Sequence, residues 1–378
     1  MSTAPTSRPS AGGGWIVHRY QARRDTSIDA AFSKRSVGGI VPVGAMLIAP
    51  GVWSMRQLRS QPPYASTDIT AVMESVIDPL RRLDDTEGGS TAAVGCVQDH
   101  IVTVETYLGR GESIDSEVRR RLLRVNAQLY QLAGWMAYDA ERHTTAQRYF
   151  AAGLRTAREI DDTDMAAYIL ACTACHLAYR GRLAQALEVA EAAVVKSRDS
   201  HPAVRSVTAS RLGYCQAAAG DLSGFRAAAD EAHRIWADQP NWDGKPDFLY
   251  WYSEDYIDIQ RSESLQLLAA TVQHGVNPII READVLLDQR IQRNTHIMPR
   301  DAVLHTAGLA RVHVKHGDLN RAVSLANTAL DRLGDVRSPR VLKALQALTF
   351  DLGRCAPALI TPGVERLHNR LLECCDPT

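Results

Sequence analysis

The sequence of 378 residues lacks the features that would place it in several large classes of proteins. Its 43 basic and 43 acidic side chains cancel, so no net charge draws the whole chain to nucleic acid or to a membrane surface. It has no uninterrupted apolar run of the ~20 residues that a membrane-spanning helix needs. It also has no convincing run of alternating β-branched residues, which argues against a β-sheet protein.

Signatures of catalysis are missing as well. We find no glycine-rich phosphate loop, no His-Glu-x-x-His motif and no serine elbow. The carboxylates are scattered as they are on any helical surface. The sequence therefore predicts a protein that is not an enzyme and that carries no cofactor.

The cysteines do not indicate a disulfide framework. Their number is odd, and most lie in apolar helical patterns, which predicts reduced thiols in a cytoplasmic protein. The seven cysteines are at positions 96, 172, 175, 215, 355, 374 and 375.

The N-terminal part of the chain differs from the rest. Residues 1–14 are rich in Pro, Ser, Gly and Thr, which predicts disorder. Residues 15–67 form a basic head with an apolar linker: residues 1–60 hold eight basic and two acidic side chains, against 35 and 41 in the remainder. The apolar stretch 36–53 could be a removed signal peptide or an anchor. Prolines and glycines interrupt it, however, and favour a buried irregular linker.

From residue 68 to residue 378 the apolar residues recur with helical spacing, and small residues repeat about every forty positions. The tetratricopeptide pattern uses small residues to let two helices approach closely and large ones to fill the gaps. The matching positions in four units are Gly134, Ala146, Phe150 and Gly153; Ala174, Ala186, Ala190 and Ala193; Gly213, Phe225, Ala229 and Ala232; and Ala310, Ala322, Ala326 and Ala329.

The spacing of these units predicts the architecture. The wide gap before the last unit predicts a further pair with helices near 247–260 and 277–292. Residues 339–352 and 362–374 are typical of closing helices. We therefore predict an all-α, tetratricopeptide-like, right-handed superhelical solenoid of about five helix pairs.

Two groups of residues resemble metal or haem sites. Cys172, Cys175 and His176 spell the c-type haem attachment motif, and zinc is a second reading of them. They lie on a helix whose Ala174 has a packing role, so we expect core residues instead. His313 and His316 are one helical turn apart, but the repeat needs a bulky packing residue at 313. The sequence therefore predicts no metal at either place.

A binding groove is the better candidate for a functional site. Helical solenoids bind ligands along their concave face, which the first helix of each pair lines. Aromatic side chains with a few charges suit a peptide or an amphipathic small molecule, whereas packing between helices is the alternative. The candidate residues are Gln131, Trp135, Asp139, Tyr179, Tyr214, Trp251, Glu254, Arg311 and Lys315.

Three segments carry a resemblance to a known family: AGWMAYDAERHTTAQRYF, AYILACTACHLAYRG and VRSPRVLKALQALTFDL. They resemble the C-terminal tetratricopeptide regions of actinobacterial helix-turn-helix transcriptional regulators of the xenobiotic-response-element type, over roughly residues 65–355. The resemblance implies an all-α sensor region joined to an N-terminal DNA-binding domain. Such a domain needs about sixty residues with a recognition helix, which residues 1–60 do not offer.

We therefore expect a cytoplasmic regulatory or sensor protein that binds a peptide or a small molecule in its groove. It would influence transcription through a partner or through a DNA-binding domain that this sequence does not contain. On its own it should bind DNA only weakly, without sequence preference and with strong salt dependence. The alternative is a general protein–protein scaffold without a small ligand. Homodimerisation stays open, and no membrane association is expected.

Overall fold

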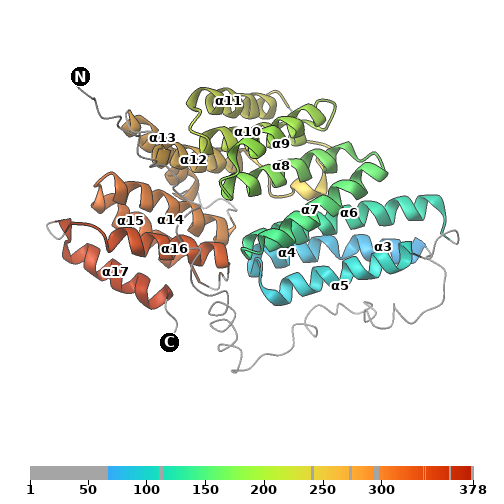
Figure 1. Ribbon diagram of the computed structural model, residues 1–378, viewed down its shortest axis with the longest axis horizontal. Helices are drawn as coiled ribbons and strands as arrows, with labels where there is room; N and C mark the ends of the chain where they lie inside the picture. Colours follow the sequence, from blue (N-terminus) through green and yellow to red (C-terminus); the bar gives the residue numbers. More distant parts are fainter. Residues whose placement is uncertain are drawn as a thin grey trace, which may run out of the picture.

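The computed structural model describes residues 67–109, 114–239, 242–271, 275–292, 298–334, 336, 338–356 and 359–375. All regular structure in these ranges is helical, which confirms the predicted all-α class there (Figure 1). None of these helices has the length and apolarity of a membrane span. The predicted disorder of residues 1–14 and the head and linker up to residue 66 lie outside the described residues.

The helices follow one another along the chain with short connections. They are α3 (Thr67–Ser75), α4 (Ile77–Glu87), α5 (Thr91–Leu108), α6 (Ser116–Asp139), α7 (His143–Glu159), α8 (Thr163–Tyr179), α9 (Leu183–Lys196), α10 (Pro202–Ala218), α11 (Leu222–Ala237), the 3-10 turn η4 (Asp247–Leu249), α12 (Glu254–Thr271), α13 (Val276–Gln292), α14 (Pro299–Lys315), α15 (Leu319–Asp331), α16 (Pro339–Leu352) and α17 (Pro362–Cys375).

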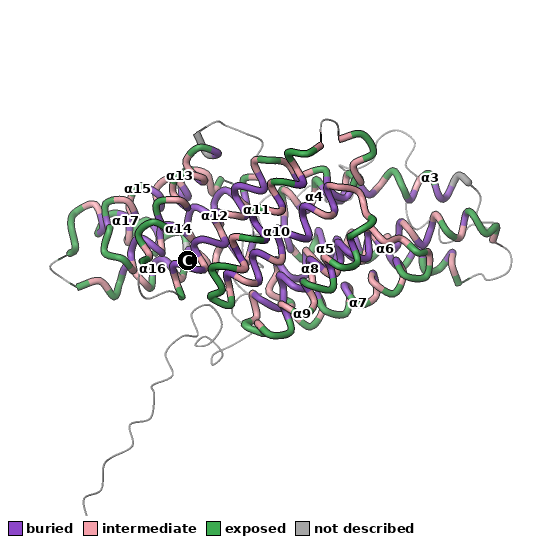
Figure 2. The backbone as a smooth tube through the Cα atoms, turned by 90° about the horizontal axis from the view of Figure 1, so that it is seen from above, coloured by how far each residue is buried: buried purple, intermediate pink, exposed green. Residues whose placement is uncertain are grey.

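Most helices pack in neighbouring pairs: α6 with α7, α8 with α9, α10 with α11, α12 with α13, and α14 with α15. The first helix of each pair also packs against the first helix of the next pair, so α8, α10, α12 and α14 follow one another. These first helices are buried along most of their length, whereas second helices such as α7 and α9 bury only one side (Figure 2).

Small residues allow the close approach of helices within a pair. A Cβ atom added at Gly134 of α6 would lie 2.5 Å from Cδ1 of Phe150 on α7. Ala146, Ala186 and Ala322, the equivalent positions of second helices, have no exposed surface. The repeat positions in the sequence are thus the places where paired helices cross, because only a small side chain fits there.

The turn inside each pair has a fixed form that glycine favours. Gly181, Gly220 and Gly317 occupy it with φ of 69°, 80° and 82°. In the first pair the same place is taken by Glu141 with φ of 60°, a conformation that non-glycine residues rarely adopt. Its carboxylate accepts hydrogen bonds from Tyr179 and from Lys343 on α16. These bonds hold the strained turn and connect it to the C-terminal helices.

The predicted helix near 247–260 begins later than expected. Asp247–Leu249 forms the 3-10 turn, and α12 starts at Glu254. Phe248 and Tyr252 are buried in the core of the α6–α10 region, and the Tyr252 hydroxyl lies 2.9 Å from Oγ of Ser206. Anchoring these aromatic side chains directs the chain across the helix pairs before α12 begins. The second predicted helix, near 277–292, corresponds to α13.

Helices from the two ends of the described chain meet. Nη1 of Arg300 on α14 donates to the carbonyl oxygen of Asp84 on α4 at 2.9 Å and to its carboxylate at 3.2 Å. The two residues are 216 positions apart. The hydroxyl of Tyr250 donates to both carboxylate oxygens of Asp85 at 2.8 Å. The array therefore curves until α4 contacts α14 (Figure 1).

Candidate functional site

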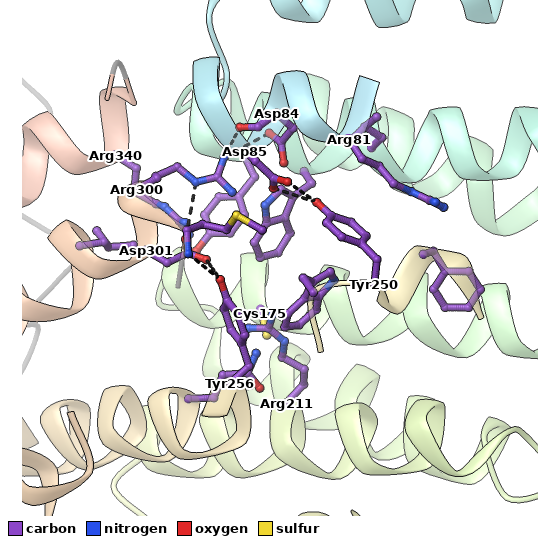
Figure 3. A pocket seen from close by; sticks show the side chains of 18 of the residues that line it. Arg81, Asp84, Asp85, Cys175, Arg211, Tyr250, Tyr256, Arg300, Asp301 and Arg340 are labelled. Atoms are coloured by element: carbon purple, nitrogen blue, oxygen red, sulfur yellow. Dashed lines mark hydrogen bonds and ion pairs between the residues drawn. The ribbon is translucent and has the colours of Figure 1, made fainter. Parts of the chain in front are cut away.

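A cavity of about 90 Å³ lies where the first helices of the pairs converge on α4 (Figure 3). Its walls come from α4, α6, α8, α10, the segment around η4, α12, α14 and α16. The lining residues are Arg81, Asp84, Asp85, Gln131, Leu132, Trp135, Tyr138, Tyr168, Cys175, Arg211, Tyr214, Phe248, Tyr250, Trp251, Tyr256, Gln260, Glu263, Met298, Arg300, Asp301, Leu304, His305 and Arg340.

Four of the nine predicted site residues line this cavity: Gln131, Trp135, Tyr214 and Trp251. They come from α6, α10 and the segment before α12. The repeat pattern predicted all four on first helices; the structure brings them together around the cavity, although Trp251 lies in the segment before α12. Their aromatic faces form much of the apolar wall.

Two further predicted residues lie close to the cavity without lining it. Asp139 is fully buried and accepts a hydrogen bond from the backbone N–H of Gly89 at 3.2 Å. Its other carboxylate oxygen lies 3.3 Å from Nε of Arg340. The ring of Tyr179 packs edge-on against Tyr138, with 5.2 Å between the ring centroids. Both side chains therefore support the wall from behind.

The last three predicted residues are elsewhere. Glu254 is exposed at the start of α12. Arg311 donates to the Asp351 carboxylate at 2.8 Å, and Lys315 lies beside it with its pKa lowered to about 8 by burial and by the Arg311 charge. Both basic residues sit in the last turns of α14, whereas the cavity uses only its first turns. Neither of them therefore lines the cavity.

Charged residues that the sequence did not single out dominate the rest of the wall. They comprise the arginines Arg81, Arg211, Arg300 and Arg340 and the acidic residues Asp84, Asp85, Glu263 and Asp301. Arg300 pairs with Asp84 and Arg340 with Asp139, and both pairs join residues that are about two hundred positions apart, so no local spacing connects them. Arg340 lies in the first turn of α16, within the segment 339–352 that the sequence predicts as a closing helix.

One end of the cavity holds a buried cluster of opposite charges. Arg300 is only 4% exposed and lies between Asp84 and Asp301. Burial raises the pKa of Asp84 to about 6, although the Arg300 charge opposes this shift. Burial also acts on Asp301, but Arg300 and His305 outweigh it and hold its pKa below the usual range. Figure 3 shows this cluster above the other end of the cavity.

The other end is built around Arg211 of α10. Its guanidinium carbon lies 5.5 Å from the ring centroid of Trp135 and 5.7 Å from that of Trp251. The thiol of Cys175 is adjacent, and Figure 3 shows it beside the Arg211 side chain. Burial raises the pKa of Cys175, but contacts with Cys215 and Arg211 outweigh burial and lower it. This end combines two aromatic faces, a thiol and a cation.

The haem-like motif lies on α8, where Cys175 lines the cavity and Cys172 and His176 do not. Cys172, Cys175 and His176 are buried to 1% exposure or less. The His176 ring packs against Tyr138, and its Nε2 lies 3.2 Å from Nδ1 of His143. Burial, aided by the His143 charge, lowers the pKa of His176 to about 4. These contacts suit a core position, and the absence of haem and zinc stays a prediction.

The second histidine pair does not converge. Nε2 of His313 lies 2.8 Å from the Asp284 carboxylate, whereas Nε2 of His316 lies 3.3 Å from the carbonyl oxygen of Ala269. Within the described ranges no group of three or more His, Cys, Asp or Glu side chains could hold a metal ion.

The cavity can bind a small molecule that offers both an apolar surface and a charged or polar group. Guanidinium and carboxylate groups orient such a ligand, and indole and phenol rings cover its apolar part. No family model and no curated protein matches this chain.

Proposed function

We propose that this protein is a cytoplasmic regulatory sensor that binds a small molecule in the cavity and influences transcription through a partner. The observation that carries the proposal is the wall itself, where aromatic faces of Trp135 and Trp251 stand beside buried charged side chains. Polar anchors inside an enclosed space favour a specific ligand over an open apolar groove. The proposed architecture is a right-handed, tetratricopeptide-like solenoid.

Ligand binding has a direct way to act on the whole array. The wall includes Asp84 and Asp85 of α4 together with Arg300 and Asp301 of α14, so a ligand contacts both ends of the described chain. A ligand that binds the closed array more tightly than an open one shifts the population toward closure. The link to transcription rests on the family resemblance of the three sequence segments.

A protein–protein scaffold is the second candidate, and one observation favours it. Phe350, Leu359, Ile360 and Leu372 are each between 46% and 52% exposed, near the C-terminal end of the described chain. Large exposed apolar side chains are candidates for an interaction surface. In the sensor proposal such a surface is where the partner would bind; in the scaffold alternative it is the whole function.

Native mass spectrometry of the purified protein tests ligand binding. We expect an added mass that disappears on denaturation and that is absent from Leu304→Trp, because the larger side chain fills the cavity. Val195→Trp is the matched control, since Val195 is exposed and lines neither the cavity nor the C-terminal apolar surface. An identical added mass in both variants would contradict the proposed site.

The regulatory part needs a separate measurement. Cells that carry Leu304→Trp should show transcript changes that resemble those of a deletion strain, whereas cells with Val195→Trp should keep the ligand-dependent response. If Leu304→Trp leaves every transcript unchanged while the protein remains folded, the result contradicts the sensor proposal and supports the scaffold alternative.

A further inference from the structure

Arg211 differs from the other arginines of the cavity because it has no carboxylate partner. Arg81 lies 2.8 Å from Asp78, Arg300 lies 3.2 Å from Asp84, and Arg340 lies 3.3 Å from Asp139, each measured between nitrogen and oxygen. Among the described residues, no carboxylate oxygen comes within 4.0 Å of the Arg211 guanidinium, and its Nε has no hydrogen-bond partner.

The missing partner matters because Arg211 is buried. Its exposed fraction is 8%, so water cannot replace a counter-charge fully. An unpaired buried charge is costly, and proteins normally pair it. The indole rings of Trp135 and Trp251 offset part of this cost through cation–π contacts. The thiol of Cys175 also contacts the guanidinium. The Nε–H has no hydrogen-bond partner and no carboxylate neutralises the charge, so the guanidinium retains capacity to bind an anion within the cavity.

The acidic side chain whose charge acts on Arg211 is Glu263, and it has another partner. Glu263 also lines the cavity, and its Oε2 lies 3.9 Å from Nδ1 of His305. Asp84, Asp85 and Asp301 belong to the opposite end, where Arg300 and Tyr250 contact them. Four carboxylates around the space repel a dianion, whereas one guanidinium without a carboxylate partner matches a single negative charge.

We infer that the ligand is a small monocarboxylic acid whose carboxylate pairs with Arg211 and whose apolar part lies against Trp135 and Trp251. This inference rests on the proposed function and assigns the chemistry of its ligand. The cavity of about 90 Å³ sets the size. A cavity of ~150 Å³ accommodates benzene, so this space suits an acid of about four to six non-hydrogen atoms.

The test compares an acid with its uncharged analogue on the unmodified protein. Butyrate and butyramide have the same shape, and calorimetry with tryptophan fluorescence reports binding of each. We expect butyrate to bind and butyramide to bind at least about thirtyfold more weakly, because the amide leaves the buried guanidinium unpaired. Inorganic phosphate at neutral pH should bind more weakly than butyrate.

Two substitutions locate the site. Arg211→Met should lower butyrate affinity at least about thirtyfold, and Arg211→Lys should restore part of it because the positive charge remains. Arg321→Met is the control, since Arg321 pairs with Asp284 and Asp288 away from the cavity. It should leave butyrate affinity unchanged. Should Arg211→Met fail to fold, the comparison of acid and amide still decides.

The outcomes separate this inference from the proposed function. Equal affinity for butyrate and butyramide, tighter binding of phosphate, or unchanged binding in Arg211→Met overturns the carboxylate inference but leaves a ligand cavity. Failure of butyrate and shorter acids to bind, while native mass spectrometry detects a bound molecule, also overturns only the inference. If neither the acids nor any other molecule bind, the proposed function fails as well.

Discussion

At the scale of single residues, His176 shows how burial sets a charge state. The side chain has no exposed surface, and its pKa is lowered to about 4. In the unfolded chain this imidazole has a pKa near 6.5. As the pH falls, it is therefore protonated in the unfolded state before it is protonated in the folded state. The contribution of neutral His176 to the free energy of unfolding is therefore fully present above pH 6.5 and is lost as the pH falls toward 4.

We predict that this one group lowers the free energy of unfolding by about 2 kcal/mol between pH 7 and pH 5. Asp84 acts in the opposite direction over the same range, because its pKa is raised to about 6 and its ionisation is unfavourable in the folded state. Urea unfolding of the protein and of His176→Leu at both pH values isolates the His176 contribution, since other groups cancel in the difference. Equal pH dependence of the two proteins would contradict the buried neutral histidine.

At the scale of helices, the sequence predicts the crossing points well because each one is local. Gly134 and Phe150 are only sixteen positions apart and belong to one helix pair, so a repeating pattern reveals their contact. The start of α12 was predicted too early. Phe248 and Tyr252 pack in the core formed by earlier helices, and the repeat pattern does not include these contacts. Pattern alone cannot show such packing between pairs.

The crossing of α6 and α7 gives a prediction with an internal control. Gly134→Ala should destabilise the protein by about 1–3 kcal/mol, because the new Cβ would lie 2.5 Å from the Phe150 ring. Gly95→Ala on α5 meets no atom within 4 Å and should stabilise by up to about 1 kcal/mol through helix propensity. Thermal or urea unfolding measures both. A neutral Gly134→Ala would show that the paired helices have room to separate.

At the scale of the whole molecule, curvature of the array creates the site, and this is what the sequence could not predict. Trp135 and Trp251 could be proposed from their repeat positions and composition. Arg211, Arg300 and Asp84 could not, because they meet only when residues up to 216 positions apart come together. Long-range ion pairs leave no periodic signal in a single sequence, so these charged residues of the cavity could not be predicted from it.

The contact between α4 and α14 leads to the last prediction. Arg300→Met removes the only arginine that pairs with Asp84 in the described part of the chain. It should destabilise the protein by about 3–5 kcal/mol above pH 7, because a buried carboxylate is left without its counter-charge. Amide hydrogens of α4 should then exchange faster. Arg119→Met, which removes an exposed pair with Glu159, should have little effect.

The pH dependence of this loss identifies its cause. Asp84 carries a charge only above its raised pKa of about 6, so the pair with Arg300 weakens as the pH falls below that value. The destabilisation by Arg300→Met should accordingly be smaller at pH 5 than at pH 7.5, whereas loss of packing alone would be the same at both. If it is equal at both pH values and α4 exchange is unchanged, the ion pair does not hold the ends of the array together. A ligand would then have to act on closure through the aromatic wall instead.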